Sequence, residues 1–448
     1  METNILGKEP IKKLLVKFAL PSIIGMIFVA IQGMIDGIFV GNFVGSKGLA
    51  GINIAQPFSQ FVMAYSLTIG VGAQTLVGIF LGEKEEKKAQ DMYKTGLLTT
   101  LFFSLVIGIL GFAFSSQIAG LLGAKGEVLI HSSLYIKTIA CFLPFVGTMF
   151  LFEFLVRTIG KPEISLIAMV VSVVVNIVLD YILIGVFSFG VVGAAFATGV
   201  SYLVALVIEL IPFFEKDSII QIFKGDFISS QVWPMIYNGS SEGVSSLASA
   251  ISMFLFNIAL MKTSGVNGVV AFSVVSYFSQ VGYMLLFGIA DAIRPIVSYN
   301  YGASYKNRMS ELLQISIKLN FLIGLFIFGF LTFVSPHMVS LFIKDNASVI
   351  PLVERGASIY AFAFLFNGFN ILISSYFTAI DDALYSIIVA LSRGLIFMTI
   401  GIFILPNIFG ISGVFLTIVF AEISTLIVSL ILCKKSEYVF FKLKLEEA

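Results

Sequence analysis

Twelve runs of about twenty predominantly apolar residues restrict the fold of this chain more than any other feature. A helix of that length crosses the hydrocarbon core of a bilayer, where every backbone amide and carbonyl needs a partner within the protein. Hydrophobic residues make up 58% of the chain and charged residues 12%, against about 45–50% and about 25% in soluble domains. The sequence therefore predicts an all-α polytopic membrane protein with spans near 14–41, 50–82, 95–115, 133–156, 163–186, 191–214, 232–260, 269–300, 314–335, 355–378, 384–405 and 411–433.

Basic residues in the predicted loops indicate how the chain enters the membrane. Loops that carry an excess of lysine and arginine stay on the cytoplasmic side. We therefore expect a plasma-membrane protein with both termini in the cytoplasm. The cytoplasmic set is Lys8, Lys12, Lys13, Lys17, Lys84, Lys87, Lys88, Lys94, Arg157, Lys161, Lys216, Lys224, Lys306, Arg308, Lys434, Lys435, Lys442 and Lys444, and the opposite set is Lys47, Lys125, Lys262 and Lys344.

The two halves of the sequence repeat each other at an offset of 220 residues. A single offset across both halves, with six spans in each, predicts two pseudo-symmetric six-helix bundles that enter the membrane in the same direction. We expect an amino-terminal lobe at residues 1–217 and a carboxy-terminal lobe at 218–448. The matches are Phe58-Ser59-Gln60 with Phe278-Ser279-Gln280, Phe189-Gly190 with Phe409-Gly410, and Gly45, Gly48, Gly82 and Gly193 with Gly265, Gly268, Gly302 and Gly413.

Four polar residues in the first half are predicted to form a cation site. Asn176 and Asp180 are four residues apart on one helical face, and a charge at the bilayer centre costs about 2.5–3.5 kcal/mol on insertion scales. Asp36 and Thr198 lie toward the same end of their spans. Oxygen atoms of these types suit a small cation such as Na+, and a buried carboxyl equally suits a proton. The alternative is that Asp36 and Asp180 reach water at the ends of their spans.

Other membrane residues permit weaker predictions. Proline removes a helical hydrogen bond and bends the helix, so Pro21 is a candidate hinge in the first span. Glu242 is a candidate residue of a cavity in the second half. Mutual neutralisation is expected for Asp291 with Arg294, at a spacing of three residues. Glu153 is expected to pair with Arg157. Pairing between helices, or snorkelling toward the membrane surface, is expected for Glu209, Arg393 and Glu422, whose partners are unassigned.

Composition and motifs exclude several classes of function. The net charge of +1 gives no nucleic-acid patch, and Cys141 and Cys433 lie in different spans, so a disulfide framework is not expected. The sequence has no phosphate-binding glycine loop that ends in Gly-Lys-Ser/Thr and no catalytic constellation. We therefore expect neither an enzyme nor a bound cofactor, and we expect a monomer.

Several motifs together resemble the multidrug and toxic compound extrusion (MATE) family, and are similar in style to its bacterial MepA-like and DinF-like branches. The resemblance covers nearly the whole chain. Its motifs are Leu20-Pro21, Ile35-Asp36-Gly37-Ile38-Phe39-Val40-Gly41, Gly70-Val71-Gly72-Ala73, Leu81-Gly82, Arg157 with Gly160, Asn176-Ile-Val-Leu-Asp180, Gly193-Ala-Ala-Phe-Ala-Thr198 and Pro295-Ile-Val-Ser-Tyr-Asn-Tyr-Gly302.

The resemblance implies a V-shaped, alternating-access transporter of two six-helix bundles. It implies export of lipophilic, often cationic compounds in exchange for Na+ or H+. Asp36, Asn176, Asp180 and Thr198 match the family's coupling site. Glu242 matches a glutamate of a second-lobe site in some members, but asparagines replace the partner acid, which favours the first-lobe site. These replacements are Asn367 and Asn370, which together with Glu242 are candidate cavity or substrate residues of the second lobe.

Two other functions stay open at this point. A lipid-linked oligosaccharide flippase shares the two-lobe build, but it needs a strongly cationic cavity for phosphates, and few basic residues fall within the spans. A membrane scaffold without transport does not account for buried carboxylates in a duplicated fold. A secondary multidrug antiporter is therefore the prediction, with ions, lipophilic substrates and the bilayer as its partners.

Overall fold

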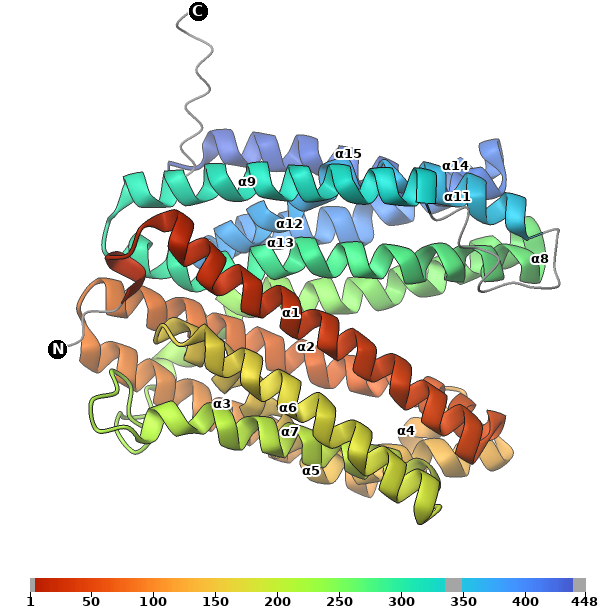
Figure 1. Cartoon of the computed structure of the whole chain (residues 1–448), viewed down its shortest axis with the longest axis horizontal. Coiled ribbons are helices and arrows are strands. Elements are labelled where there is room, and N and C mark those ends of the chain that lie inside the picture. Colours follow the sequence, from red (N-terminus) through yellow and green to blue (C-terminus); the bar gives the residue numbers. More distant parts are fainter. Residues whose placement is uncertain (1–4, 335–348, 438–448) are drawn as a thin grey trace, which may run out of the picture. The chain divides into compact units, whose positions relative to one another are not determined.

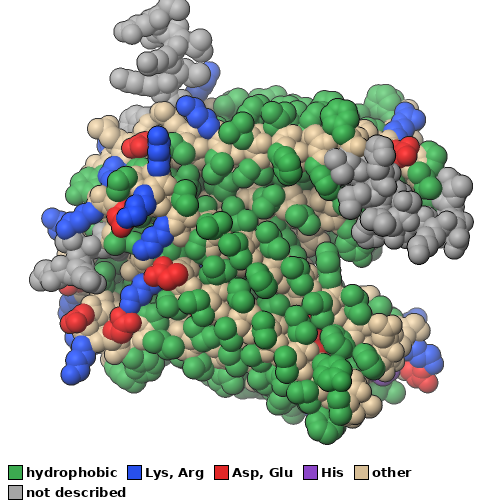
Figure 2. Space-filling view, in the orientation of Figure 1, with side chains coloured by type: hydrophobic (Ala, Val, Ile, Leu, Met, Phe, Trp, Pro, Cys, Tyr) green, Lys and Arg blue, Asp and Glu red, His purple; other side chains and the backbone are tan. Residues whose placement is uncertain are grey.

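The computed structural model of this chain describes residues 5–334 and 349–437, and every regular element in these ranges is a helix. Lys344, Lys442 and Lys444, which contribute to the predicted orientation, lie outside them. Most of the long helices are joined by short connections, and residues 215–228 make a longer one between α7 and α8 (Figure 1). Hydrophobic side chains cover the middles of these helices, and charged side chains gather near their ends (Figure 2). This distribution is expected of helices that cross a bilayer.

The predicted all-α membrane fold is confirmed. Eleven described helices are long and apolar enough to cross a membrane, and a bent pair of helices makes a twelfth candidate. The α-helices are α1 (Ile11–Phe39), α2 (Ser46–Gly82), α3 (Glu86–Ala113), α4 (Ser115–Leu121), α5 (Gly126–Thr158), α6 (Pro162–Asp180), α7 (Gly190–Phe214), α8 (Ser229–Gly302), α9 (Lys306–Gly329), α11 (Ile350–Ala361), α12 (Phe364–Ala379), α13 (Ala383–Leu391), α14 (Phe397–Phe409) and α15 (Ile411–Lys435).

The tenth predicted span is broken, where the sequence suggested a continuous helix over 355–378. Its two parts, α11 and α12, meet at an angle of 48°. At the break, the amides of Phe362 and Ala363 donate to carbonyls three residues earlier, at 3.3 and 2.9 Å. This tighter hydrogen-bond pattern changes the direction of the helix axis. The sequence gives no sign of the break, because neither proline nor glycine occurs there.

Four segments of π-helix in the described ranges continue or interrupt the spans. They are η2 (Val40–Val44), η3 (Tyr181–Val186), η4 (Phe330–Val334) and η6 (Ser392–Ile396), and a short 3-10 turn, η1 (Ile5–Gly7), precedes α1. A π-turn holds one extra residue and often occurs at functional sites. Asp36 lies one turn before η2, and Asp180 is the residue immediately before η3.

The backbone repeats its breaks at the predicted offset. Gly45 and Gly265, 220 residues apart, have φ angles of 87° and 60°, and each separates two spans. Gly190 and Gly410 form a second such pair, with φ angles of 59° and 56°. These left-handed conformations favour glycine because a Cβ atom would collide with the backbone. The matched glycines therefore mark equivalent turns in the two halves.

The chain packs as two compact units. One unit comprises Leu20–Ser246 with the short segment up to Lys8, and the other comprises Glu9–Ala19 with the described residues from Leu247 onward. The change of unit within α1 thus falls between Ala19 and Leu20, directly before Pro21. A domain boundary between residues 217 and 218 stays a prediction.

Within the first unit, α5 packs against α2, α3 and α7, and α6 packs against α7. The approach of α7 to α5 depends on Gly199, since a Cβ atom there would collide with the ring of Phe142. This close contact brings Thr198 and Tyr202 of α7 into the wall of the same cavity as Tyr135 of α5. Small residues at helix contacts commonly allow such approach in membrane bundles.

Candidate functional site

The two predicted carboxylates of the first unit come together in space. Asp36 on α1 and Asp180 on α6 place their side-chain carboxyl groups within hydrogen-bonding reach of each other. A carboxylate has no proton to donate, so this arrangement is repulsive while both groups are ionised. A proton shared between them, or a cation held by both, turns the contact into an attractive one.

The polar groups of this site are deeply buried. Asn176 is 0% exposed and Asp180 is 1% exposed. Among the residues that the structure describes, neither side-chain oxygen of Asp180, neither amide atom of Asn176, nor Oδ1 of Asp36 has a hydrogen-bond partner. Buried polar atoms are nearly always satisfied in folded proteins. Their orphaned state here is expected of groups that bind a ligand.

A cavity of about 260 Å³ opens beside Asp36. Thr198 lines it, and its hydroxyl donates to the carbonyl of Ala194 at 3.0 Å, which leaves the hydroxyl lone pairs to accept a cation. Polar side chains from four helices complete the wall and could not be assigned from the sequence. They are Gln32 on α1, Gln56, Ser59 and Gln60 on α2, Tyr135 on α5 and Tyr202 on α7.

The structure therefore brings three of the four predicted residues to one place. Asp36 and Asp180 are neighbours, and Thr198 shares the cavity wall with Asp36. Asn176 lies one helical turn before Asp180 on α6, fully buried. That these residues bind Na+ or a proton stays a prediction, and the oxygen atoms present fit either ion. For Na+, the ligands would be the two carboxylates, the amide oxygen and the threonine hydroxyl.

Pro21 lies inside α1, which continues as a helix through it. The residues before it pack with one unit and those from Leu20 onward with the other. A helix that lacks one backbone hydrogen bond bends more readily at that point. The position fits the predicted hinge, which stays a prediction.

The second predicted set is distributed over both units. Glu242 is buried in the part of α8 that packs with the first unit, whereas Asn367 and Asn370 are buried on α12 in the second. Asn370 Nδ2 donates to the carboxylate of Glu422 at 2.8 Å, and its own Oδ1 accepts from Ser429 at 3.1 Å. Asn370 is thus engaged in a structural network, and a substrate role for this set stays a prediction.

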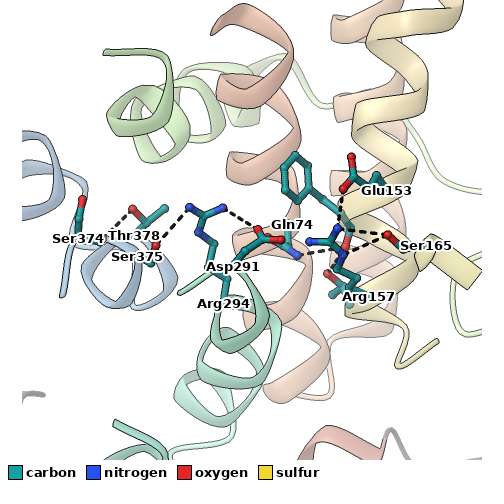
Figure 3. Close-up of polar contacts among 11 residues, drawn as sticks. Gln74, Glu153, Arg157, Ser165, Asp291, Arg294, Ser374, Ser375 and Thr378 are labelled. Carbon is teal, nitrogen blue, oxygen red and sulfur yellow. Dashed lines mark hydrogen bonds and ion pairs between the residues drawn. The ribbon is translucent and has the colours of Figure 1, made fainter. Parts of the chain in front are cut away.

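The ionisable residues expected to pair do so in each unit taken by itself. In the first, Arg157 Nη2 lies 2.5 Å from Glu153 (Figure 3). In the second, Arg294 Nη1 lies 3.0 Å from Asp291 (Figure 3). Arg393 and Glu422, whose partners the sequence left open, are 3.6 Å apart. Glu209 departs from this expectation: it is fully buried, and neither of its oxygens has a hydrogen-bond partner among the described residues.

The sequence of this chain matches a known protein family. The sequence profile of the MatE family matches the chain twice, over residues 21–182 and 243–403. The multidrug export protein MepA of Staphylococcus aureus is 27% identical over 417 residues, which cover 93% of this chain and 92% of that protein.

Two solved structures share the fold. One is described as an outward-facing multidrug resistance MATE family transporter, and the other as a MOP superfamily transporter from Pyrococcus furiosus whose binding pocket has reverse polarity. Each has a TM-score of 0.89 and 24% identity, and covers 96% of this chain and 97% of the other. At that identity the likeness concerns the fold alone, and it agrees with the duplicated helical architecture.

Proposed function

The chain belongs to the MatE family of multi-pass membrane transporters, and from this premise we propose that it is a secondary multidrug efflux transporter. It exports lipophilic, often cationic compounds in exchange for Na+ or H+. The similarity to MepA, a multidrug export protein, supports the substrate class. It acts as a monomer in the plasma membrane with both termini in the cytoplasm, and it catalyses no chemical step and needs no cofactor.

The observation that carries the proposal is the contact between Asp36 and Asp180. Two like unit charges about 4 Å apart repel by about 4 kcal/mol at an effective dielectric constant near 20. Moving a two-state equilibrium from 1:99 to 99:1 takes about 5.5 kcal/mol. Repulsion that a cation removes is therefore of the order needed to favour one conformation over another.

Coupling then follows from a difference in affinity. With the site empty, repulsion between the carboxylates favours the arrangement that accepts substrate. When a cation enters, the repulsion between Asp36 and Asp180 falls, and the segment of α1 from Leu20 onward bends at Pro21. The cavity beside Asp36 narrows, and substrate leaves. The cation drives export only because it binds the two arrangements with different affinity.

The flippase alternative has less support. A phosphate-bearing lipid headgroup requires free cationic side chains to bind it. In the second unit, Arg294 is paired with Asp291, and Arg393 is paired with Glu422. These guanidinium groups are neutralised by neighbouring carboxylates, so they do not make the strongly cationic cavity that a flippase needs.

The test is transport by the purified chain in vesicles. Ethidium efflux is followed with a sodium gradient and a pH gradient imposed separately. We expect one of the two to drive efflux, and Asp36→Asn to abolish the effect of that gradient. Asp217→Asn, which changes an exposed residue between α7 and α8, is the matched control. Absence of flux under both gradients with correctly folded protein contradicts the proposal.

A further inference from the structure

Glu209, in the last third of α7, is a buried acid that the coupling mechanism above does not use. Its side chain is 0% exposed. Both carboxylate oxygens lack a hydrogen-bond partner in the part of the chain that the structure describes. An isolated ionised carboxylate in an apolar interior is strongly unfavourable, and such a group either finds a positive partner or takes up a proton.

Two charged groups of α5, Glu153 and Arg157, lie within electrostatic range of Glu209. Arg157 Nη2 binds the Glu153 carboxylate at 2.5 Å, and the Arg157 Nε and Nη2 atoms donate to the hydroxyl of Ser165 at 3.3 and 3.2 Å (Figure 3). The guanidinium therefore already neutralises one carboxylate. Glu209 is a second carboxylate beside a single positive charge, so the cluster is one proton short of neutrality.

Two neighbouring helices contribute neutral polar side chains near this cluster. Helix α6 contributes the neutral Ser165, and its acidic residue Glu163 is exposed. Helix α2 contributes the neutral Gln74, whose amide donates to the carbonyl of Phe154 at 3.2 Å. A proton on Glu209 is the simplest way to balance the cluster.

One face of α7 joins this cluster to the cavity beside Asp36. Thr198, Tyr202 and Glu209 follow one another at intervals of four and seven residues, which places them on the same side of the helix. Tyr202 lines the cavity, and its hydroxyl lies within electrostatic range of both Asp36 and Glu153. Seven residues span about 10 Å along a helix, so Tyr202 stands between the two acidic sites.

We propose that Glu209, set against the Glu153–Arg157 pair, is a second proton-binding site of the first unit, and that protons pass between it and Asp36 along the Thr198–Tyr202–Glu209 face of α7. A proton needs one oxygen, whereas a hard metal cation takes about six oxygen ligands, more than this cluster offers. The occupancy of Glu209 by a proton is independent of the proposed function, and only its part in coupling rests on it.

Infrared difference spectroscopy of the purified full chain tests the occupancy. A protonated carboxyl group absorbs infrared light at a different frequency from a carboxylate. Glu209→Gln is therefore expected to remove one protonated-carboxyl band at neutral pH. Glu209→Asp is expected to shift that band and serves if the glutamine variant does not fold. The proposal is overturned if a folded Glu209→Gln protein keeps all of its protonated-carboxyl bands, or if no band shifts in Glu209→Asp.

A second variant tests the cause. Glu153→Gln releases Arg157 from its partner, and we expect the guanidinium to pair with Glu209 and expel its proton. The band assigned to Glu209 then disappears although Glu209 is intact. Persistence of that band in Glu153→Gln contradicts the neutralisation that the structure assigns to this cluster.

Transport separates this inference from the proposed function. In vesicles with a pH gradient, Glu209→Gln is expected to slow ethidium efflux at least tenfold while ethidium binding stays within twofold of the wild type. If the wild type moves no ethidium but the band is lost in Glu209→Gln, the proposed function fails and the proton site stands. If wild-type efflux is coupled to protons and the variant matches it, the relay along α7 is wrong.

Discussion

Asp36 and Asp180, 144 positions apart in the sequence, present their carboxyl groups to each other inside one unit of the fold. Each group lies beside a π-helical segment, and each has at least one buried oxygen without a hydrogen-bond partner among the described residues. The pair is a place where unfavourable electrostatics persist in the folded protein. Such places are expected where a ligand completes the structure.

Removing one charge from this pair should stabilise the protein while it abolishes the effect of the coupling ion. Asp180→Asn removes the repulsion, so we expect the free energy of unfolding without coupling ion to rise by about 1–3 kcal/mol. The stabilisation that the coupling ion gives to the wild type should vanish, since ligand binding no longer favours the folded state. Thermal melts against sodium concentration and against pH measure both effects. An undiminished ion-dependent shift in this variant argues that the ion binds elsewhere.

Straightening α1 should slow transport without weakening the cation site. Pro21→Ala restores a backbone hydrogen bond at the change of packing unit, so the helix resists bending there. We expect ethidium efflux to fall several-fold while the ion-dependent shift in melting temperature is retained. Pro406→Ala, in the interior of α14, is the control and should transport normally. Equal efflux by both variants counts against a hinge at Pro21.

A side chain at Gly199 should disturb the contact between α7 and α5. The added Cβ atom collides with the ring of Phe142, so Gly199→Ala is expected to destabilise the protein by about 1–3 kcal/mol. Gly329→Ala is the matched control, because a Cβ atom at that position meets no heavy atom within 4 Å among the described residues. Melting temperatures of both variants in the same detergent provide the measurement, and an unchanged value for Gly199→Ala contradicts the packing described.

Truncating Asn370 should destabilise the protein, because it leaves the buried carboxylate of Glu422 without this hydrogen-bond donor. The amide of Asn370 satisfies one carboxylate oxygen at 2.8 Å, and losing a buried partner costs about 1–3 kcal/mol. Asn370→Ala should therefore melt well below the wild type. Asn407→Ala, which removes an exposed amide bonded to the carbonyl of Phe403, should melt close to it. Similar melting of the two variants shows that the Asn370 network contributes little.

Much of the architecture could be predicted because membrane helices are recognised in a sequence by their length and apolar composition. The repeat was visible in glycines such as Gly45 and Gly265, whose backbone angles only glycine adopts readily. The break between α11 and α12 left no such mark, since it arises from a local change in hydrogen bonding without proline or glycine.

The candidate site was predicted in part for a similar reason. Charged residues in apolar spans are rare enough to single out Asp36 and Asp180. Tyr135 and Tyr202 have no such signal, because tyrosine is common in membrane helices and only packing shows which ones line a cavity. The sequence identifies Glu209 as a charged residue within a span. Its lack of a partner depends on the pairing of Arg157 with Glu153, which only the folded structure shows.

The π-turns beside the two acids also affect how the protein tolerates changes in length. In η2 the amide of Gly45 donates to the carbonyl of Val40 at 3.1 Å, and in η3 the amide of Phe187 donates to that of Ile182 at 2.9 Å. Each bond encloses one residue more than an α-helical turn. Deleting a single residue inside either turn leaves the same two backbone groups bonded, now in an ordinary α-helix. The ends of these spans that follow the π-turns can thus shorten during evolution while the acids that precede the turns keep their positions.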